Sequence, residues 1–298
     1  MTLVVALVTA DIGFIVADTL LSSEYVLKGN PGPVNGMHHT LKVQILNGTT
    51  AVAFAGDPAQ STELISDLNH QLSRDPDTNT SEYLFHGYTT ALEQTTQGLE
   101  PDCEFLVMQI KPDGRKLAHV TRDGISNCER AYIGDPTAYR RLMELRKPYQ
   151  PPATQHVQQP DGSFREVPLT VSKGEIEFAE ISDALDALCH ERTNRSVGTI
   201  SDGVTRVVDA RISKEFEYLQ LGEVTVSLEE GTAGYSLLAS NTGRRGIAMY
   251  FRSGGMGFLF AVGDPEGCRK EYAETMEQFV ALAKDRFGLN LTGVGWTN

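Results

Sequence analysis

Three residues near the N-terminus have side chains whose types suit nucleophilic chemistry. Thr2 directly follows Met1, Asp18 closes the second of two apolar runs, and Lys42 lies at the start of a third. Removal of Met1 gives Thr2 a free α-amino group, whose ordinary pKa of about 7.7–8.0 makes it a general base at neutral pH. That amine can activate the hydroxyl of its own threonine. If Met1 is removed, Thr2 could therefore act as an N-terminal nucleophile, and Asp18 and Lys42 are candidates for the charges that support it.

Asp18 and Lys42 suit the supporting roles. A carboxylate at the end of a buried run can hold a neighbouring cation, and an ammonium group close to Thr2 lowers the pKa of its hydroxyl and amine. Each residue alone also has a plainer interpretation, as a strand threonine, a turn aspartate and an exposed strand lysine. Lys28 is a competing lysine, but Lys42 directly precedes the strand that leads to Gly56.

Gly56 lies in a motif that occurs three times. The sequences are FAGDPA at 54–59, YIGDPT at 132–137 and AVGDPE at 261–266. Glycine permits a sharp turn, aspartate caps a helix and proline suits the first helical position, so the motif predicts a strand-to-helix turn each time. A phosphate site is disfavoured because the aspartate would repel an anion. At the first copy, the Gly56 N–H could also stabilise a developing oxyanion.

The hydrophobic patterns predict the elements that must position these residues. Continuous apolar runs indicate strands covered on both faces. Strands are expected at 3–8, 13–17, 41–46, 51–55, 103–110, 115–121, 128–133, 204–211, 215–220 and 223–228, and helices at 57–73, 81–97, 136–146 and 176–193. The proline-rich stretch 148–173 is interpreted as an irregular insertion with a small hairpin around Asp161-Gly162. Strands at 246–251 and 257–262 and a helix at 265–286 complete the chain.

This order of elements predicts an α+β fold. Two antiparallel sheets stacked face to face, with helices outside, would bury the continuous apolar strands on both sides. We therefore expect a four-layer α-β-β-α sandwich over residues 1–228, with the insertion at about 148–173. Residues 229–298 are expected to form a C-terminal β-β-α extension or small subdomain.

Composition excludes several classes of function. The 298-residue chain has a formal net charge of −13, which argues against a nucleic-acid or anionic-membrane surface. No run approaches the roughly 18 apolar residues of a membrane span, and no signal peptide is recognised. The four cysteines form no C-x-x-C pair, so we expect reduced thiols, no metal and no cofactor in a cytoplasmic protein. The His38-His39 pair is interpreted as part of a loop rather than a metal site.

Four stretches, in this order, resemble one family. They are TLVVALVTADIGFIVAD, LKVQILNGTTAVAFAGDPAQSTELI, DGRKLAHVTRDGISNCERAYIGDPTAY and SVGTISDGVTRVV. They resemble the N-terminal-nucleophile (Ntn) hydrolases, specifically the proteasome β subunit and the HslV-type peptidase. The resemblance covers about residues 2–220; residues 229–298 have no counterpart in it.

The resemblance implies roles for individual residues. Thr2 would be the nucleophile and, through its amine, the base, with Asp18 and Lys42 as the charge pair. Gly56 would supply the oxyanion hole, Ser201 would help to position the amine, and Phe54 would shape a substrate pocket. The implied reaction is peptide-bond hydrolysis through an acyl-enzyme ester, on peptides or unfolded proteins. A homo-oligomeric ring and an ATP-driven unfoldase partner are also implied.

The chain departs from the family pattern at three positions. Asp57 replaces a glycine beside the oxyanion turn, Asp135 replaces a serine, and Gly198 stands where an aspartate is expected. These departures leave two alternatives open. One is a catalytically inactive scaffold or binding protein of the same fold, and the other is an amidohydrolase that uses Thr2 on a small amide.

Overall fold

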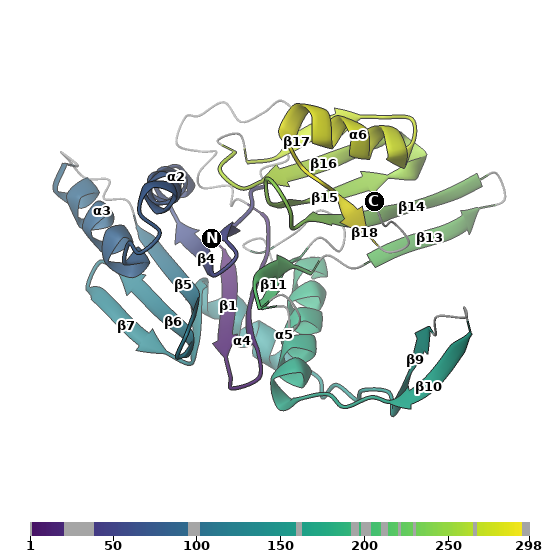
Figure 1. Ribbon diagram of the computed structural model, residues 1–298, viewed down its shortest axis with the longest axis horizontal. Helices are drawn as coiled ribbons and strands as arrows, with labels where there is room; N and C mark the ends of the chain where they lie inside the picture. Colours follow the sequence, from purple (N-terminus) through teal and green to yellow (C-terminus); the bar gives the residue numbers. More distant parts are fainter. Residues whose placement is uncertain are drawn as a thin grey trace.

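The computed structural model describes residues 2–20, 39–94, 102–158, 163–191, 197, 204–209, 214–219, 222–228, 231–264 and 267–293. Within these residues the chain is α+β, with three antiparallel sheets, a separate two-stranded hairpin and five α-helices. Figure 1 shows β1 (Leu3–Val8) at the centre, with helices α2 (Pro58–Arg74) and α3 (Thr80–Gln94) to its left and α5 (Lys173–His190) to its right. The α+β class expected from the sequence is confirmed.

The first sheet carries the N-terminal hairpin at its centre. Its order is β12-β11-β2-β1-β8, with β1 Leu3–Val8, β2 Gly13–Ala17, β8 Arg130–Gly134, β11 Thr205–Asp209 and β12 Phe216–Tyr218. Hydrophobic residues of β1 and β2 are buried on both faces, as the continuous apolar runs predict. The register pairs Val4 with Ala17, which brings the two ends of the hairpin together.

The second sheet is a meander in chain order. It contains β3 Val43–Asn47, β4 Thr50–Gly56, β5 Cys103–Lys111, β6 Gly114–Thr121 and β7 Gly124–Cys128. The strand expected at 128–133 is instead two strands in different sheets, β7 and β8, because the chain crosses from one sheet to the other at Glu129.

Each of these two sheets has one face covered by a pair of helices. Helices α4 (Pro136–Leu145) and α5 (Lys173–His190) pack on Leu3, Val5 and Phe14 of the first sheet. Helices α2 (Pro58–Arg74) and α3 (Thr80–Gln94) pack on the second sheet in the same manner. The other faces of these two sheets meet in one hydrophobic cluster. Alternate residues of β1, such as Val4 and Ala6, belong to it together with residues of β3, β4 and β5.

A third sheet extends the same hydrophobic cluster. It has the order β13-β14-β15-β16-β17, with β18 paired to β14. The strands are β13 Gly222–Leu228, β14 Gly231–Ser240, β15 Gly246–Phe251, β16 Met256–Ala261, β17 Arg269–Tyr272 and β18 Thr292–Gly293. One face packs on α6 (Met276–Phe287), and the other contributes Ile247, Met249 and Phe260 to the cluster between the first two sheets.

Three expectations about the C-terminal region need correction. Strand β13 pairs with β14, so sheet membership places the start of the third sheet at Gly222 rather than after 228. The region is a six-stranded sheet with one helix, not a β-β-α unit. The third Gly-Asp-Pro copy does not begin a helix: Asp264 instead binds Arg269 through two hydrogen bonds of 2.8 and 2.9 Å. The final helix therefore begins later, at Met276, after strand β17.

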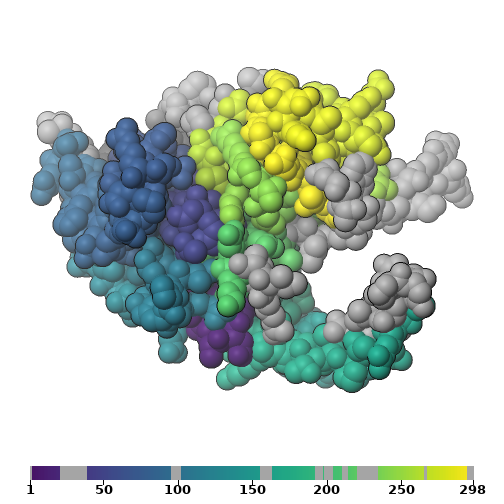
Figure 2. Space-filling view, viewed as in Figure 1, coloured from purple at the N-terminus to yellow at the C-terminus, as the bar shows by residue number. Residues whose placement is uncertain are grey.

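The insertion contains the expected hairpin. Strands β9 (Thr154–Gln158) and β10 (Phe164–Pro168) pair antiparallel. The hairpin projects away from the body of the molecule (Figure 2), and Phe164, the first residue of β10, is largely exposed.

Candidate functional site

Asp18 and Lys42 form a buried ion pair. The Lys42 Nζ donates to Asp18 Oδ1 at 2.8 Å, and both side chains are 0 % exposed. The same ammonium donates to the carbonyl of Leu20. The Asp18 Oδ1 also accepts from the N–H of Leu3 at 3.0 Å. The structure thus brings the predicted charge pair together and ties it to the residue that follows Thr2.

The register of the β1–β2 hairpin places Asp18 at this position. Because Val4 pairs with Ala17, Asp18 lies opposite Leu3, and the Asp18 N–H donates to the Leu3 carbonyl at 3.3 Å. The chain beyond β2 is held by a hydrogen bond of 2.8 Å from the Thr40 N–H to the Thr19 carbonyl. The segment that carries Asp18 is therefore joined by backbone hydrogen bonds both to the start of β1 and to the segment that leads into Lys42.

Two contacts fix the strand that follows Lys42. The Phe54 N–H donates to the Lys42 carbonyl at 3.1 Å. The buried phenol of Tyr218, from β12, donates to the Val43 carbonyl at 2.9 Å and accepts from the Ile45 N–H at 3.1 Å. This single hydroxyl satisfies two backbone groups on the open edge of β3 and links the two N-terminal sheets.

Burial dominates the electrostatics around the pair. Desolvation lowers the pKa of Lys42 more than the Asp18 carboxylate raises it. The Cys189 thiol on α5 lies within electrostatic range of Asp18 and Lys42, and its pKa is raised first by burial and then by Asp18 and Asp186. Because the thiolate is the reactive form, Cys189 is not a nucleophile at neutral pH.

Thr2 lies at the start of β1, on the face toward the second sheet. It alternates with Leu3, which faces α4 and α5, and shares its face with Val4. Thr2 is 6 % exposed. Its carbonyl accepts from the Asp135 N–H at 2.7 Å, so the start of β1 is fixed to the end of β8.

Gly56 is exposed at the end of β4 with a φ of +96°. A Cβ at this position would lie 1.7 Å from the Asp102 carbonyl, so the turn requires glycine. N–H groups alternate in direction along a strand, and the Phe54 N–H points to the Lys42 carbonyl. The Gly56 N–H therefore also points toward the β3 side of β4. It lies at a level beyond Val43, the first residue of β3.

Asp57 follows Gly56 and Asp135 follows Gly134, and both aspartates cap helices. Asp57 Oδ1 accepts from Ala59 N–H at 2.9 Å and Gln60 N–H at 3.1 Å. Asp135 Oδ1 accepts from Thr137 N–H at 2.7 Å and from the N–H of the next residue. The predicted capping role of the motif is confirmed at its first two copies, and both carboxylates accept hydrogen bonds from a helix terminus.

Of the other predicted site residues, the structure places the Phe54 side chain away from this cluster. Phe54 is 1 % exposed and packs with α2 and α3, so its part in substrate binding stays a prediction. Ser201, like Gly198, lies outside the described residues. Sequence patterns did not indicate Tyr218 or Cys189 as neighbours of the charge pair. No motif predicts that a tyrosine in a short strand or a cysteine in a helix will lie close to Lys42.

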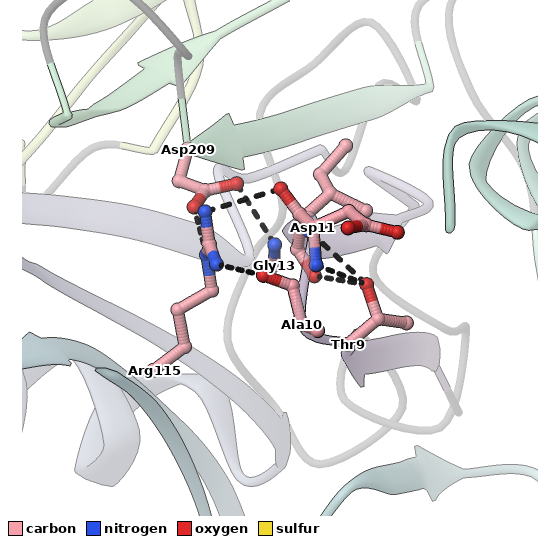
Figure 3. A network of polar contacts seen from close by, with 7 residues as sticks. Thr9, Ala10, Asp11, Gly13, Arg115 and Asp209 are labelled. Carbon is pink, nitrogen blue, oxygen red and sulfur yellow. Dashed lines mark hydrogen bonds and ion pairs between the residues drawn. The ribbon is translucent and has the colours of Figure 1, made fainter. Parts of the chain in front are cut away.

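The hairpin is also clamped at its opposite end (Figure 3). The Arg115 guanidinium pairs with Asp209 and donates to the carbonyls of Ala10 and Asp11. Asp209 Oδ1 accepts from the Gly13 N–H at 2.8 Å. The turn of the hairpin is thus held by a side chain from each N-terminal sheet.

An open cleft of about 1280 Å³ lies beside this clamp. Its walls are the β1–β2 turn, the β5–β6 turn, the segment between β7 and β8, and the first turn of α5. The cleft is at the far end of β1 from Thr2, so the predicted site residues do not line it.

No protein-family model matches the chain, and no curated protein matches it. Among the described residues, no three His, Cys, Asp or Glu side chains are grouped as a metal site would require. No described helix combines the length and hydrophobicity needed to span a membrane.

Proposed function

We propose that the protein is an Ntn hydrolase of the proteasome β-subunit and HslV type, in which Thr2 is the nucleophile after removal of Met1. The observation that carries the proposal is the Asp18–Lys42 pair, fully buried and bonded to the N–H of Leu3. Burying two charges costs several kcal/mol of desolvation per ion, and an apolar pair is often as stable. A charge pair that is buried at this cost and bonded to the residue after Thr2 favours a chemical role.

The packing supports the proposed fold. The proposal arranges α4 and α5, the first sheet, the second sheet, and α2 and α3 as the four-layer sandwich of these hydrolases. The three hydrophobic clusters between these elements are consistent with that order. The third sheet is then an addition whose inner face extends the central cluster.

The proposed chemistry uses the residues as follows. The Thr2 Oγ attacks the substrate carbonyl carbon while its proton passes to the Thr2 amine. The C–N bond breaks, the proton passes to the leaving amine, and an ester on Thr2 remains. Water then attacks the ester carbon and gives a proton to the Thr2 amine; the bond from that carbon to Thr2 Oγ breaks, the acid product leaves, and the proton returns to Oγ to restore the hydroxyl. The Lys42 ammonium favours the ionised form of a hydroxyl near it, and the Gly56 N–H would donate to the oxyanion.

The helix caps remove one argument against activity. A carboxylate beside the oxyanion turn would oppose the developing charge, but Asp57 accepts hydrogen bonds from the first turn of α2. Its charge is thereby engaged by the helix N-terminus. The presence of Asp57 therefore does not decide between a peptidase, a small-amide amidohydrolase and an inactive scaffold. An experiment must decide between them.

A mass measurement on protein from its native cell tests the proposal. The expected result is a chain that begins at Thr2 and gains one covalent adduct on that residue with a peptide vinyl sulfone. Thr2→Ala should form no adduct and hydrolyse no fluorogenic peptide, whereas Thr2→Ser should retain both properties. An intact Met1, or full activity in Thr2→Ala, would overturn the proposal. Hydrolysis of small acyl amides without peptides would favour the amidohydrolase, and the elution volume tests for a homo-oligomeric ring.

A further inference from the structure

The β9–β10 hairpin has a surface that the described part of the chain leaves uncovered. Its two strands pair with each other and, among the described strands, with no other. Phe164 is 68 % exposed, and neither Phe164 nor Val167 belongs to the hydrophobic clusters of the described residues. An isolated two-stranded hairpin is at best marginally stable in water. We refer to residues 153–169 as the arm, and its exposed surface suits a contact with another molecule.

The root of the arm is anchored to the body of the molecule. The Leu169 N–H donates to the Ala153 carbonyl at 3.0 Å, which continues the ladder of the hairpin to its root. Before the arm, the Tyr149 N–H donates to Glu180 Oε1 on α5 at 3.0 Å. After the arm, Ser172 caps the N-terminus of α5 through a capping box. Both ends of the arm are therefore held at α5, while the arm itself projects outward (Figure 2).

The open cleft of about 1280 Å³ is adjacent to the root of the arm. Pro168 ends β10, and Lys173, which begins α5, already lines the cleft. The first turn of α5 packs closely on the β1–β2 turn, because a Cβ at Gly174 would lie 2.5 Å from Ile12 Cγ2. The start of α5 thus holds the root of the arm and forms one wall of the cleft. A projection and a recess therefore lie next to each other on the molecule.

The chemistry of the cleft suits the side chains that the arm presents. Val8 and Leu117 line the cleft, and both contribute to the hydrophobic cluster between the sheets. Charged side chains of both signs stand on its walls, including the exposed Glu129. On the arm, Phe164 and Arg165 are neighbours and both are exposed. An aromatic side chain that enters an apolar recess, with a cation near a carboxylate, is a typical anchor of a protein–protein contact.

We propose that the arm of one molecule occupies the cleft of a second copy, whose own arm returns the contact. A two-fold contact requires a surface patch that is complementary to itself. An adjacent projection and recess meet this requirement, because the two-fold rotation places each arm against the cleft of the other copy. Phe164 then packs on Val8 and Leu117, and Arg165 lies near Glu129. The cleft is at the far end of β1 from Thr2, so the contact does not depend on the proposed reaction.

Sedimentation equilibrium of the purified full chain measures the association. The expected result is a concentration-dependent equilibrium between the 32.6 kDa chain and larger species that contain the two-fold pair. Phe164→Ser should weaken this association about thirtyfold or more, as the loss of an aromatic anchor commonly does. Tyr272→Ser is the matched control, because Tyr272 on β17 is 66 % exposed and lies outside the arm and the cleft. The control should associate like the unchanged chain.

A cross-link tests which surfaces meet. Cys128 lines the cleft and is a free thiol. A variant with both Phe164→Cys and Cys128→Ser is mixed with the unchanged chain and oxidised with copper phenanthroline in air. A disulfide between position 164 and Cys128 can then form only between two molecules, and peptide mass spectrometry should detect it.

Three results would overturn the proposal. They are a chain that stays monomeric at the highest concentration, an association that Phe164→Ser leaves unchanged, and the absence of the link between position 164 and Cys128. If the arm instead bound a different protein, the purified chain would stay monomeric and no such link would form, so this outcome also counts against the two-fold contact.

Discussion

Replacing Lys42 by methionine should destabilise the protein strongly. Methionine is close in length but carries no charge, so the variant leaves the Asp18 carboxylate buried with the Leu3 N–H as its remaining partner among the contacts described above. Removing one partner of a buried ion pair typically costs about 3–5 kcal/mol. Set against a total folding free energy of about 5–15 kcal/mol, this loss would be visible as a large fall in the urea midpoint.

A matched lysine provides the control for this measurement. Lys116 pairs with Asp113 at the same distance of 2.8 Å, but its side chain is 55 % exposed. Exposed pairs contribute about 0–1 kcal/mol, so Lys116→Met should scarcely shift the unfolding curve. The two variants thus make the same chemical change in two environments that differ in burial.

A double-mutant cycle isolates the pair itself. Asp18→Asn retains an oxygen that can accept from the Leu3 N–H, so most of its cost comes from the charge. Adding Asp18→Asn to Lys42→Met removes the isolated carboxylate, and the double variant should be more stable than the two single costs predict, by about 1–3 kcal/mol. Unfolding is followed by circular dichroism in urea. Additive costs, or a Lys42→Met cost no larger than that of Lys116→Met, would refute the buried pair.

Three other predictions concern the framework of the site. Gly134→Ala should destabilise by more than 3 kcal/mol or prevent folding, because its Cβ would meet the Thr2 carbonyl at 1.9 Å, whereas Gly114→Ala has open space and should show only the cost of its positive φ; urea midpoints compare the two. Tyr218→Phe leaves two backbone groups of β3 without their partner and should cost about 1–3 kcal/mol. Burial raises the pKa of the Cys103 thiol to about 11, so iodoacetamide should not label it in folded protein at pH 8, as mass spectrometry would show. Because only the unfolded thiol ionises near its ordinary value of 9.0, this group should lower stability as the pH rises from 9 toward 11.

Local patterns predicted most of the elements, whereas the pairing of Asp18 with Lys42 was implied by the family resemblance. The apolar runs at 3–8 and 13–17 coincide with β1 and β2, and the Asn47-Gly48 turn joins β3 and β4 as expected. Asp57 and Asp135 cap helices because the Gly-Asp-Pro pattern satisfies its own backbone groups locally. The third Gly-Asp-Pro sequence does not cap a helix, because Arg269, five residues away, offers Asp264 a stronger partner than a helix N-terminus.

Contacts between distant segments could not be read from one sequence. Tyr218 meets Val43 and Ile45 across more than 170 positions, and no spacing rule predicts which tyrosine will reach an open strand edge. The Gly134 N–H donates to Glu104 at 3.3 Å, and the alternation of polar residues in β5 does not predict this contact. The contact depends on how the second sheet is stacked on the first, which periodicity does not encode.

The third sheet bears directly on how rigid the site is. The Gly263 N–H donates to the Gln44 side chain at 3.2 Å, and Gly267 lies against His39 and Thr40. These contacts fall on both sides of Lys42 in sequence. Because the inner face of the third sheet also belongs to the cluster between the first two sheets, it shares their core instead of forming a core of its own. The lysine strand is therefore held by β4 on one edge, by Tyr218 on the other, and by the third sheet near its start, so a C-terminal region without a counterpart in the resembled family still belongs to the framework of the proposed site.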